Sequence, residues 1–214
     1  MESDKYALTF SNGPTLPTNR LLDSLKTGNV SAASFFMLGV NVRNFPSAAK
    51  RVQSASFSIL AAAYNFVNMK DMAPADIVPQ FQLTNDVFKD VGICRRPNLY
   101  RPPGGDYNDA SRHYASRAGY RTVTWNVDTK DDLYAASSPD TLLSNLQTSV
   151  RELGSSGLHM QQDTTVASVT LVPRVRACLA VRFRGQAICA ATVGLVGCVV
   201  DCACVAVACG VLRS

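Results

Sequence analysis

The chain has 214 residues, of which 47% are hydrophobic and 17% are charged, a composition that can fill a hydrophobic core and excludes intrinsic disorder. The net charge is +5, and most of the excess lies in residues 164–214, with five arginines and one aspartate. The preceding 163 residues are close to neutral, at 16 basic and 15 acidic. They lack the basic face of a nucleic-acid-binding protein, so we expect no nucleic-acid partner.

Strand-like and helix-like segments alternate along the chain. Residues 6–10 favour a strand and end at the Ser-Asn-Gly-Pro turn of residues 11–14. An apolar run at residues 58–64 fits either a strand or a buried helix, and residues 99–101 lead into a Pro-Pro-Gly-Gly turn. Further strands are expected at residues 33–38 and 122–127, and helices at residues 18–26, 46–53, 74–90, 108–118 and 139–153.

This alternation of strands and helices predicts parallel βα units, and therefore an α/β fold with an open sheet or a barrel. In both architectures the chemistry collects at the C-terminal ends of the strands. Those strand ends are where functional side chains are expected.

Four segments at these strand ends resemble motifs of the NodB-homology polysaccharide deacetylases, carbohydrate esterase family four, and look closest to those of fungal chitin deacetylases. The segments are ALTFSNGP at residues 7–14 (family TFDDGP), ASFFMLGVN at 33–41 (ATFFxxGxN), YRPPGGDYN at 100–108 (RPPYG) and WNVDTKDD at 125–132 (WxVDSxDW). The resemblance implies a distorted parallel β/α barrel over residues 6–175. Residues 176–214 lie beyond it, as an atypical apolar tail rich in Cys, Ala and Val. It leaves open whether the barrel is complete at its C-terminal end.

The resemblance also implies which positions of this chain correspond to the family's catalytic machinery. The family uses zinc or another divalent metal to polarise the acetamide and activate water, a carboxylate as base and a histidine as acid. The base position falls on Ser11 and the acid position on Gln162. The three metal-ligand positions fall on Asn12, Ala62 and Phe66.

These replacements remove the groups that the family's reaction needs. A serine hydroxyl is no base near neutral pH, glutamine does not titrate, and the side chains of alanine and phenylalanine donate to no metal. We therefore expect an inactive deacetylase homologue without a metal cofactor. A carbohydrate-binding pseudoenzyme and a degenerate gene product without function are the alternatives.

Other residues at the motif positions are closer to the family pattern. Arg101 and Asp131 are preserved, and they are expected to form an ion pair that holds two strand ends together. The resemblance places substrate contacts at the Arg-Pro-Pro loop and the fourth motif, and implies chitin or another N-acetylglucosamine polymer as the ligand. The expected contact residues are Pro103, Gly104, Tyr107 and Trp125.

The chain has two histidines. His113 lies in a helical stretch and is interpreted as solvated or capping. The family's LxHD motif, which carries the acid, aligns with residues 160–163 (MQQD). His159 offers an alternative alignment of this motif, in which His159 or Asp163 would support residual deacetylation. A single histidine together with Asn12 does not make a three-ligand zinc site.

Both chain ends bear on the compartment. No signal peptide is visible at the N-terminus, although the family is usually secreted or associated with the cell wall, so the localisation stays open. Residues 187–212 contain one charged residue, Asp201, and six of the seven cysteines lie in the tail. Aberrant sequence, a membrane span and soft-metal thiolates are the three interpretations of this tail.

Overall fold

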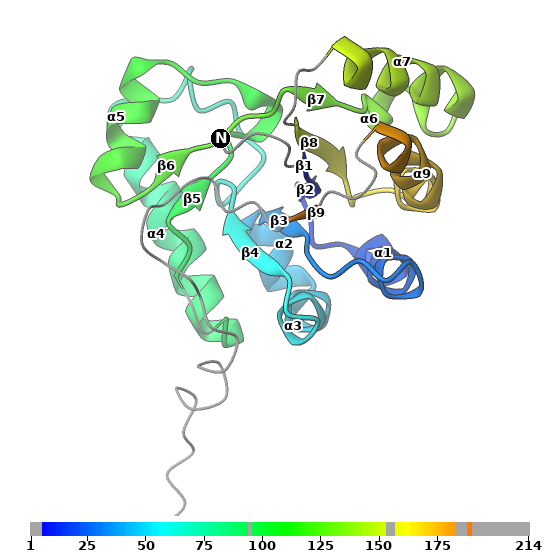
Figure 1. The fold of residues 1–214 in the computed structure, drawn as a ribbon. Helices are drawn as coiled ribbons and strands as arrows, with labels where there is room; N and C mark the ends of the chain where they lie inside the picture. Colours follow the sequence, from blue (N-terminus) through cyan, green and yellow to red (C-terminus); the bar gives the residue numbers. More distant parts are fainter. Residues whose placement is uncertain (1–5, 94–95, 153–156, 183–187, 190–214) are drawn as a thin grey trace, which may run out of the picture.

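The computed structural model describes residues 6–93, 96–152, 157–182 and 188–189. Its centre is a curled sheet whose strand pairs are all parallel, in the order β6-β5-β4-β3-β2-β8-β1-β9, with β7 also paired to β8. Helices surround this sheet, as Figure 1 shows. The strands are β1 (Tyr6–Ala7), β2 (Thr9–Ser11), β3 (Ser34–Met37), β4 (Ser58–Ala61), β5 (Leu99–Tyr100), β6 (Arg121–Thr122), β7 (Val127–Asp128), β8 (Gly157–Gln162) and β9 (Ile188–Cys189).

The sheet closes only partly into a barrel. No pairing joins β6 to β7 within the described ranges. The chain passes from one to the other through residues 123–126, which first bond to β5 (Val123 N to Tyr100 O, 2.8 Å) and then to β8 (Asn126 N to Leu158 O, 3.1 Å). The single strand predicted at residues 122–127 is therefore wrong, because these residues cross the gap between the two edges. The fold is a distorted parallel β/α barrel.

The predicted helices are present with small shifts of their ends. They are α1 (Leu16–Thr27), α3 (Pro46–Ser54), α4 (Pro74–Val91), α5 (Asp109–Arg117) and α7 (Pro139–Glu152). The apolar run at residues 58–64 begins as strand β4, which resolves the earlier ambiguity in favour of a strand. The additional elements are α2 (Gly39–Asn44), the short helix η1 (Pro103–Gly105), α6 (Asp131–Tyr134), α8 (Val166–Thr170) and α9 (Val172–Arg182).

The curled sheet has an outer and an inner apolar layer. Outward-facing side chains such as Phe10 and Phe35 pack with Leu21, Leu146 and Val175 of the surrounding helices. The inner layer is small and consists of Phe36, Leu60, Leu99 and Val123, with Leu158 packed against them. Because side chains alternate along a strand, the inner face of β2 is formed by Thr9 and Ser11, beside this inner layer.

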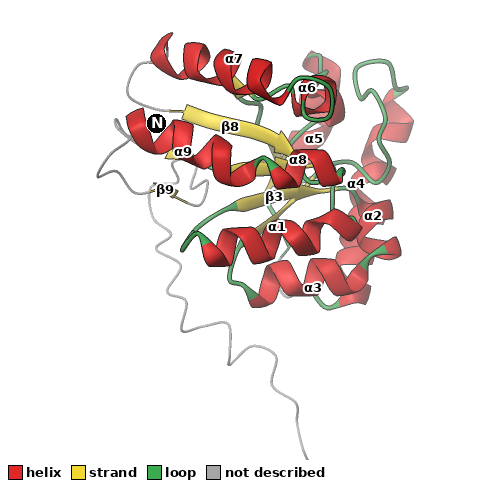
Figure 2. Ribbon diagram, turned by 90° about the vertical axis from the view of Figure 1, so that its right-hand side faces the viewer, coloured by secondary structure: helices red, strands yellow, loops and turns green. Residues whose placement is uncertain are grey.

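Helix α9 crosses the boundary expected at residue 175. Val175 and Leu179 are both buried in the outer core, and α9 packs against α7 (Figure 2). Within the described residues, no helix is long and apolar enough to cross a membrane. The expected tail features, a membrane span or a thiolate cluster, fall almost entirely on residues that lie outside the described ranges.

Candidate functional site

The base and acid positions are neighbours at the carboxyl end of the sheet. Ser11, the last residue of β2, pairs with Phe36 of β3 on one side and with Gln162, the last residue of β8, on the other. Parallel pairing brings these strand ends to one edge. The candidate site is therefore built around the β2–β8 pair.

Arg101 fills the inside of the barrel next to the base position. Its side chain leaves the end of β5 and is 2% exposed. Nη1 donates to Thr9 Oγ1 at 2.7 Å and to Ser11 Oγ at 2.9 Å, and Nη2 approaches the carbonyl oxygen of Thr124 at 3.4 Å. The guanidinium carbon lies 4.0 Å from the centroid of the Phe36 ring.

Burial sets the protonation behaviour of Arg101. It lowers the pKa of the guanidinium from 12.5 to about 9, and the charge of Asp128 partly opposes this shift. A group with this pKa stays cationic at neutral pH. The base position thus holds a hydroxyl under a positive charge, which disfavours proton acceptance by Ser11.

Asp131 forms hydrogen bonds at the acid position and does not contact Arg101. Its carboxylate accepts the backbone N–H of Gln162, with Oδ1 and Oδ2 at 3.2 and 3.0 Å, and the Thr129 hydroxyl at 2.8 Å. The expected ion pair between Arg101 and Asp131 is wrong, since none is formed by these two described residues. The physical reason is that Arg101 bonds to β2 whereas Asp131 bonds to β8.

The three metal-ligand positions do not form a donor set. Asn12, with φ 71°, follows β2, and its carbonyl oxygen accepts Asn41 Nδ2 at 2.6 Å. Ala62 is buried directly after β4, and the Phe66 side chain is 62% exposed. One amide side chain beside a methyl group and a phenyl ring supplies at most one weak ligand, where a catalytic zinc needs three.

No other described residues replace this donor set. The described ranges contain no group of three or more His, Cys, Asp or Glu side chains arranged to hold a metal ion. The residues present therefore do not fit the family's divalent metal, and no step of a reaction is derived through it.

His159 lies on the opposite face of the sheet from Ser11. Its ring is fully buried in the outer core, with ring centroids 6.0 Å from Tyr6 and 6.4 Å from Phe10. Neither ring nitrogen has a hydrogen-bond partner among the described residues. Burial and the charge of Arg101 lower the pKa of His159 to about 3. A neutral ring on the helix side of the sheet does not reach the strand-end site.

Asp163 is occupied by structural contacts. Its Oδ2 accepts the Thr18 hydroxyl at 2.6 Å, and its backbone oxygen accepts the Thr15 hydroxyl at 2.7 Å. Burial raises the pKa of the Asp163 carboxyl to about 7, and the hydrogen bond from Thr18 opposes this shift. A Cβ on Gly13 would lie 2.1 Å from the carboxylate. Asp163 therefore ties the 11–14 turn to α1 and does not face the site.

The predicted substrate residues lie on the loop after β5 and on the crossing segment. Pro103 is buried, Gly104 is exposed, and Tyr107 is 43% exposed. The half-buried Trp125 donates from Nε1 to Asp128 Oδ2 at 3.1 Å, and its ring lies 5.5 Å over Arg101. A Cβ on Gly105 would lie 2.6 Å from the Trp125 ring. Trp125 therefore closes the inner end of the site, whereas Tyr107 points to solvent.

Two loops join beside these strand ends. Asp106 accepts Asn68 Nδ2 at 3.3 Å and pairs with Lys70 Nζ at 3.1 Å. These contacts bring the loop that carries Phe66 beside the loop that carries Tyr107. Both aromatic side chains are largely exposed.

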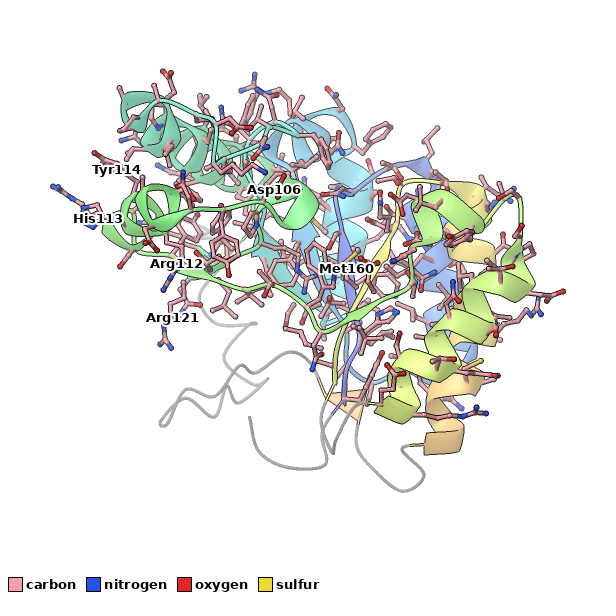
Figure 3. The ribbon with its side chains drawn as sticks, turned by 90° about the horizontal axis from the view of Figure 1, so that it is seen from above. Asp106, Arg112, His113, Tyr114, Arg121 and Met160 are labelled. Atoms are coloured by element: carbon pink, nitrogen blue, oxygen red, sulfur yellow. The ribbon has the colours of Figure 1, made fainter. Side chains whose placement is uncertain are left out.

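Two surface hollows lie away from this arrangement. One is between α4 and α5, and the other is formed by α5 and β6. Figure 3 shows Arg112, His113 and Arg121 of the second hollow at the outer edge of the molecule, far from Met160 at its centre. His113 is exposed on α5, as interpreted from the sequence. Neither hollow contains a motif position.

Two residues of the site were not predicted from the sequence. Thr9 accepts the bond from Arg101 and donates to the carbonyl oxygen of His159, and Asp128 anchors Trp125. Strand alternation could have found Thr9, because residues 9 and 11 share one face of β2. The position of Asp128 depends on the chain crossing, for which no sequence signal exists.

Comparisons with known proteins identify the family of this chain. Residues 1–123 match the polysaccharide deacetylase family. A peptidoglycan-N-acetylglucosamine deacetylase of Bacillus cereus is 33% identical over 148 residues, which cover 66% of this chain and 50% of that protein. Chitin deacetylase 2 of Saccharomyces cerevisiae is 28% identical over 173 residues, covering 80% and 54%. The chain thus spans about half the length of these curated relatives.

The fold also matches a solved structure. The crystal structure of a family 4 carbohydrate esterase pseudoenzyme from Bacillus anthracis superposes with a TM-score of 0.69 at 24% identity. The superposition covers 82% of this chain and 62% of that one. It supports the same distorted barrel.

Proposed function

The chain belongs to the polysaccharide deacetylase family, and we propose that it is a member without metal-dependent deacetylase activity. The observation that carries this proposal is the interaction of Arg101 with Ser11 at 2.9 Å. The base position holds a neutral hydroxyl bonded to a buried cation. The preserved fold supports descent from an enzyme of this family, and the site chemistry supports loss of its reaction.

Hydrolysis of an acetamide needs three contributions at one point. The carbonyl must be polarised, a water must lose a proton, and the leaving amine must gain one. Asn12, Ala62 and Phe66 do not hold the ion that polarises the carbonyl. Ser11 takes no proton, and Gln162 gives none. Missing one of these groups would leave some rate, but missing all three leaves no pathway among the described residues.

Metal binding tests this proposal directly. Zinc content is measured after dialysis of the folded protein against a buffer that contains zinc. We expect no stoichiometric zinc in this chain. The matched control carries Asn12→Asp, Ala62→His and Phe66→His, which restores three donors at the ligand positions. The cysteines are alkylated beforehand, because thiolates of the tail also bind zinc. Stoichiometric zinc in the alkylated, otherwise unaltered chain would overturn the proposal.

A second candidate function is binding of an N-acetylglucosamine polymer without turnover. It is favoured by the two joined loops, which present Phe66 and Tyr107 to solvent next to the strand ends. Exposed aromatic faces are suitable for stacking on sugar rings. Asn68 and Lys70 supply polar groups beside them.

Titration with chito-oligosaccharides tests this second candidate. Tyr107→Ala and Phe66→Ala are expected to weaken binding, and Leu133→Ala is the control because Leu133 is equally exposed, at 62%, on the separate helix α6. Binding that is unchanged in both aromatic variants would contradict a role for the loops.

A further inference from the structure

Arginines are concentrated in one short part of the chain. Residues 95–121 contain six of the fifteen arginines and two aspartates, although the first 163 residues as a whole are close to neutral. Arg101 is buried inside the barrel. Four others are exposed and line the two hollows on either side of α5, namely Arg96, Arg112, Arg117 and Arg121. The fold therefore gathers positive charge on one surface, away from the barrel mouth.

The hollow formed by α5 and β6 presents two of these guanidiniums. It has a volume of about 520 Å³, and Figure 3 shows Arg112, His113 and Arg121 at the edge of the molecule. The Arg121 side chain makes no hydrogen bond or ion pair within the described residues. Arg112 Nη1 lies 3.5 Å from Asp109 Oδ1 in a solvent-exposed ion pair, and such pairs are weak. A carboxylate ligand therefore finds one free guanidinium and one that is weakly engaged.

Strand β6 is an open edge of the sheet beside the same hollow. In the described part of the chain it pairs with β5 alone, and Figure 1 shows it at one end of the curled sheet. The N–H groups of Arg121 and Val123 both donate towards β5, at 2.9 and 2.8 Å. Because consecutive residues of a strand bond to opposite sides, the N–H and C=O of Thr122 point away from β5. Thr122 lines the hollow, which thus offers a backbone donor and acceptor.

We propose that this hollow and the edge of β6 form a docking surface for an extended acidic segment of a partner protein. The segment lies beside β6 as an added strand and bonds to the backbone of Thr122. Its acidic side chains meet Arg112 and Arg121. Peptides that add to sheet edges combine main-chain bonds with side-chain contacts in this way. The inference goes beyond the proposed function, since this surface contains none of the motif positions.

The lining favours a peptide over other anionic partners. Acidic polysaccharides and single-stranded nucleic acids gain affinity by stacking on exposed aromatic rings, but the Tyr120 ring in this lining is 2% exposed. A second copy of this chain would place its own arginines against Arg112 and Arg121, and like charges at an edge prevent such pairing. Acidic side chains on an extended backbone complement both the charge of the hollow and the open edge.

Fluorescence anisotropy with labelled peptides tests the inference on the full chain. The first peptide is about eight residues long and alternates glutamate with threonine, so that its glutamates share one face when it is extended. The second has glutamine in place of glutamate, and the third carries N-methyl groups on its backbone amides. We expect saturable binding of the first peptide alone, and this binding should weaken as salt is added.

Charge variants locate the peptide on the protein. Arg112→Gln combined with Arg121→Gln is expected to weaken binding by about fivefold or more. Arg20→Gln is the matched control, because Arg20 is an exposed arginine on the separate helix α1. Asp109→Asn should strengthen binding by about twofold, since it releases Arg112 from its ion pair. A gain of binding does not arise from loss of the fold.

Thr122→Pro tests the backbone bond at the edge. Proline removes the N–H that points away from β5 and leaves the bonds of Arg121 and Val123 in place, and edge strands tolerate proline at such positions. We expect the variant to bind the first peptide about fivefold more weakly. If Thr122→Pro fails to fold, the N-methylated peptide makes the same test on the unaltered protein.

Each outcome decides the inference. Weaker binding on N-methylation and in the double arginine variant, with stronger binding in Asp109→Asn, would confirm it. Absence of binding to the first peptide would overturn it, and the arginines would then protect the open edge from self-association. Equal binding of the N-methylated peptide would also overturn it, because the surface would then bind any polyanion, an acidic polysaccharide included. Zinc content and acetate release are measured separately from all of these results.

Discussion

The carboxylate of Asp131 accepts the backbone N–H of Gln162, with its two oxygens 3.2 and 3.0 Å from the nitrogen. Arg101 makes the corresponding contact with Ser11 at the neighbouring strand. Each preserved charge therefore holds one of the two replaced catalytic positions in place. The strand ends stay ordered although neither position can transfer a proton.

Replacement of Asp163 by asparagine is expected to remove a pH dependence of stability. Burial raises the folded-state pKa of Asp163 from 3.8 to about 7. The stability that the bound proton contributes is therefore fully present below the pKa of the unfolded state, and it is lost as the pH rises to about 7. Relative to Asp163→Asn, the unaltered protein should lose about 1 kcal/mol of unfolding free energy per pH unit across this window.

Urea unfolding of both proteins at several pH values measures this difference. The readout is the slope of the unfolding free energy against pH. A constant difference between the two proteins is not informative, because asparagine also changes the hydrogen bond to Thr18. Parallel stability curves between about pH 4 and 7 would contradict a buried, proton-binding Asp163.

Replacement of His159 by leucine is expected to stabilise the protein. Both ring nitrogens are buried and have no hydrogen-bond partner in the part of the chain that the structure describes, and an unsatisfied buried polar group costs about 1–3 kcal/mol. A leucine of similar size satisfies the apolar contacts with Tyr6 and Phe10. Thermal melts at neutral pH should show a melting temperature several degrees higher, while His113→Gln on the exposed face of α5 should change little.

The same variant should also resist acid better. The folded-state pKa of His159 is lowered from 6.5 to about 3. The stability that depends on its neutral form is therefore fully present above the pKa of the unfolded state, and it is lost as the pH falls toward 3. This loss runs opposite to that of Asp163, and the two partly cancel between about pH 4 and 6.5. A lower melting temperature for His159→Leu would mean that the ring nitrogens have partners in solution.

Replacement of Gly105 by alanine is expected to displace Trp125. A Cβ at this position would lie 2.6 Å from the Trp125 ring. Gly104 is a matched control, since it also has a positive φ, 68° against 79°, but a Cβ there would meet no atom within 4 Å. Both variants carry the backbone strain, and only Gly105→Ala should shift Trp125 fluorescence. Equal spectra in the two variants would contradict the packing of Trp125 on this loop.

Much of the fold could be predicted because its signals are local. Leucine spacing in α1 and the apolar periodicity of α4 mark helices without any knowledge of their neighbours. The strand predicted at residues 122–127 failed for the converse reason. Its β-favouring side chains are compatible with a strand, but two different strands, β5 and β8, bond to its two ends.

The candidate site, like the fold, could be predicted from the sequence only in part. Residue types at Ser11, Gln162 and the ligand positions follow from the sequence, and they determine the missing chemistry. The hydrogen-bond partner of Arg101 could not be predicted from the sequence. Arg101 bonds to β2 and not to Asp131, and this depends on a contact between residues about ninety positions apart. The burial of His159 on the outer face likewise depends on strand register.

Acetate release from acetylated chito-oligosaccharides, with zinc or cobalt supplied, tests the central claim most directly. The folded protein is compared with a metal-only blank and with chitin deacetylase 2 of Saccharomyces cerevisiae as positive control. We expect no release above the blank at any metal concentration. Metal-dependent release that Ser11→Ala or Gln162→Ala abolishes would contradict it and would make these positions catalytic.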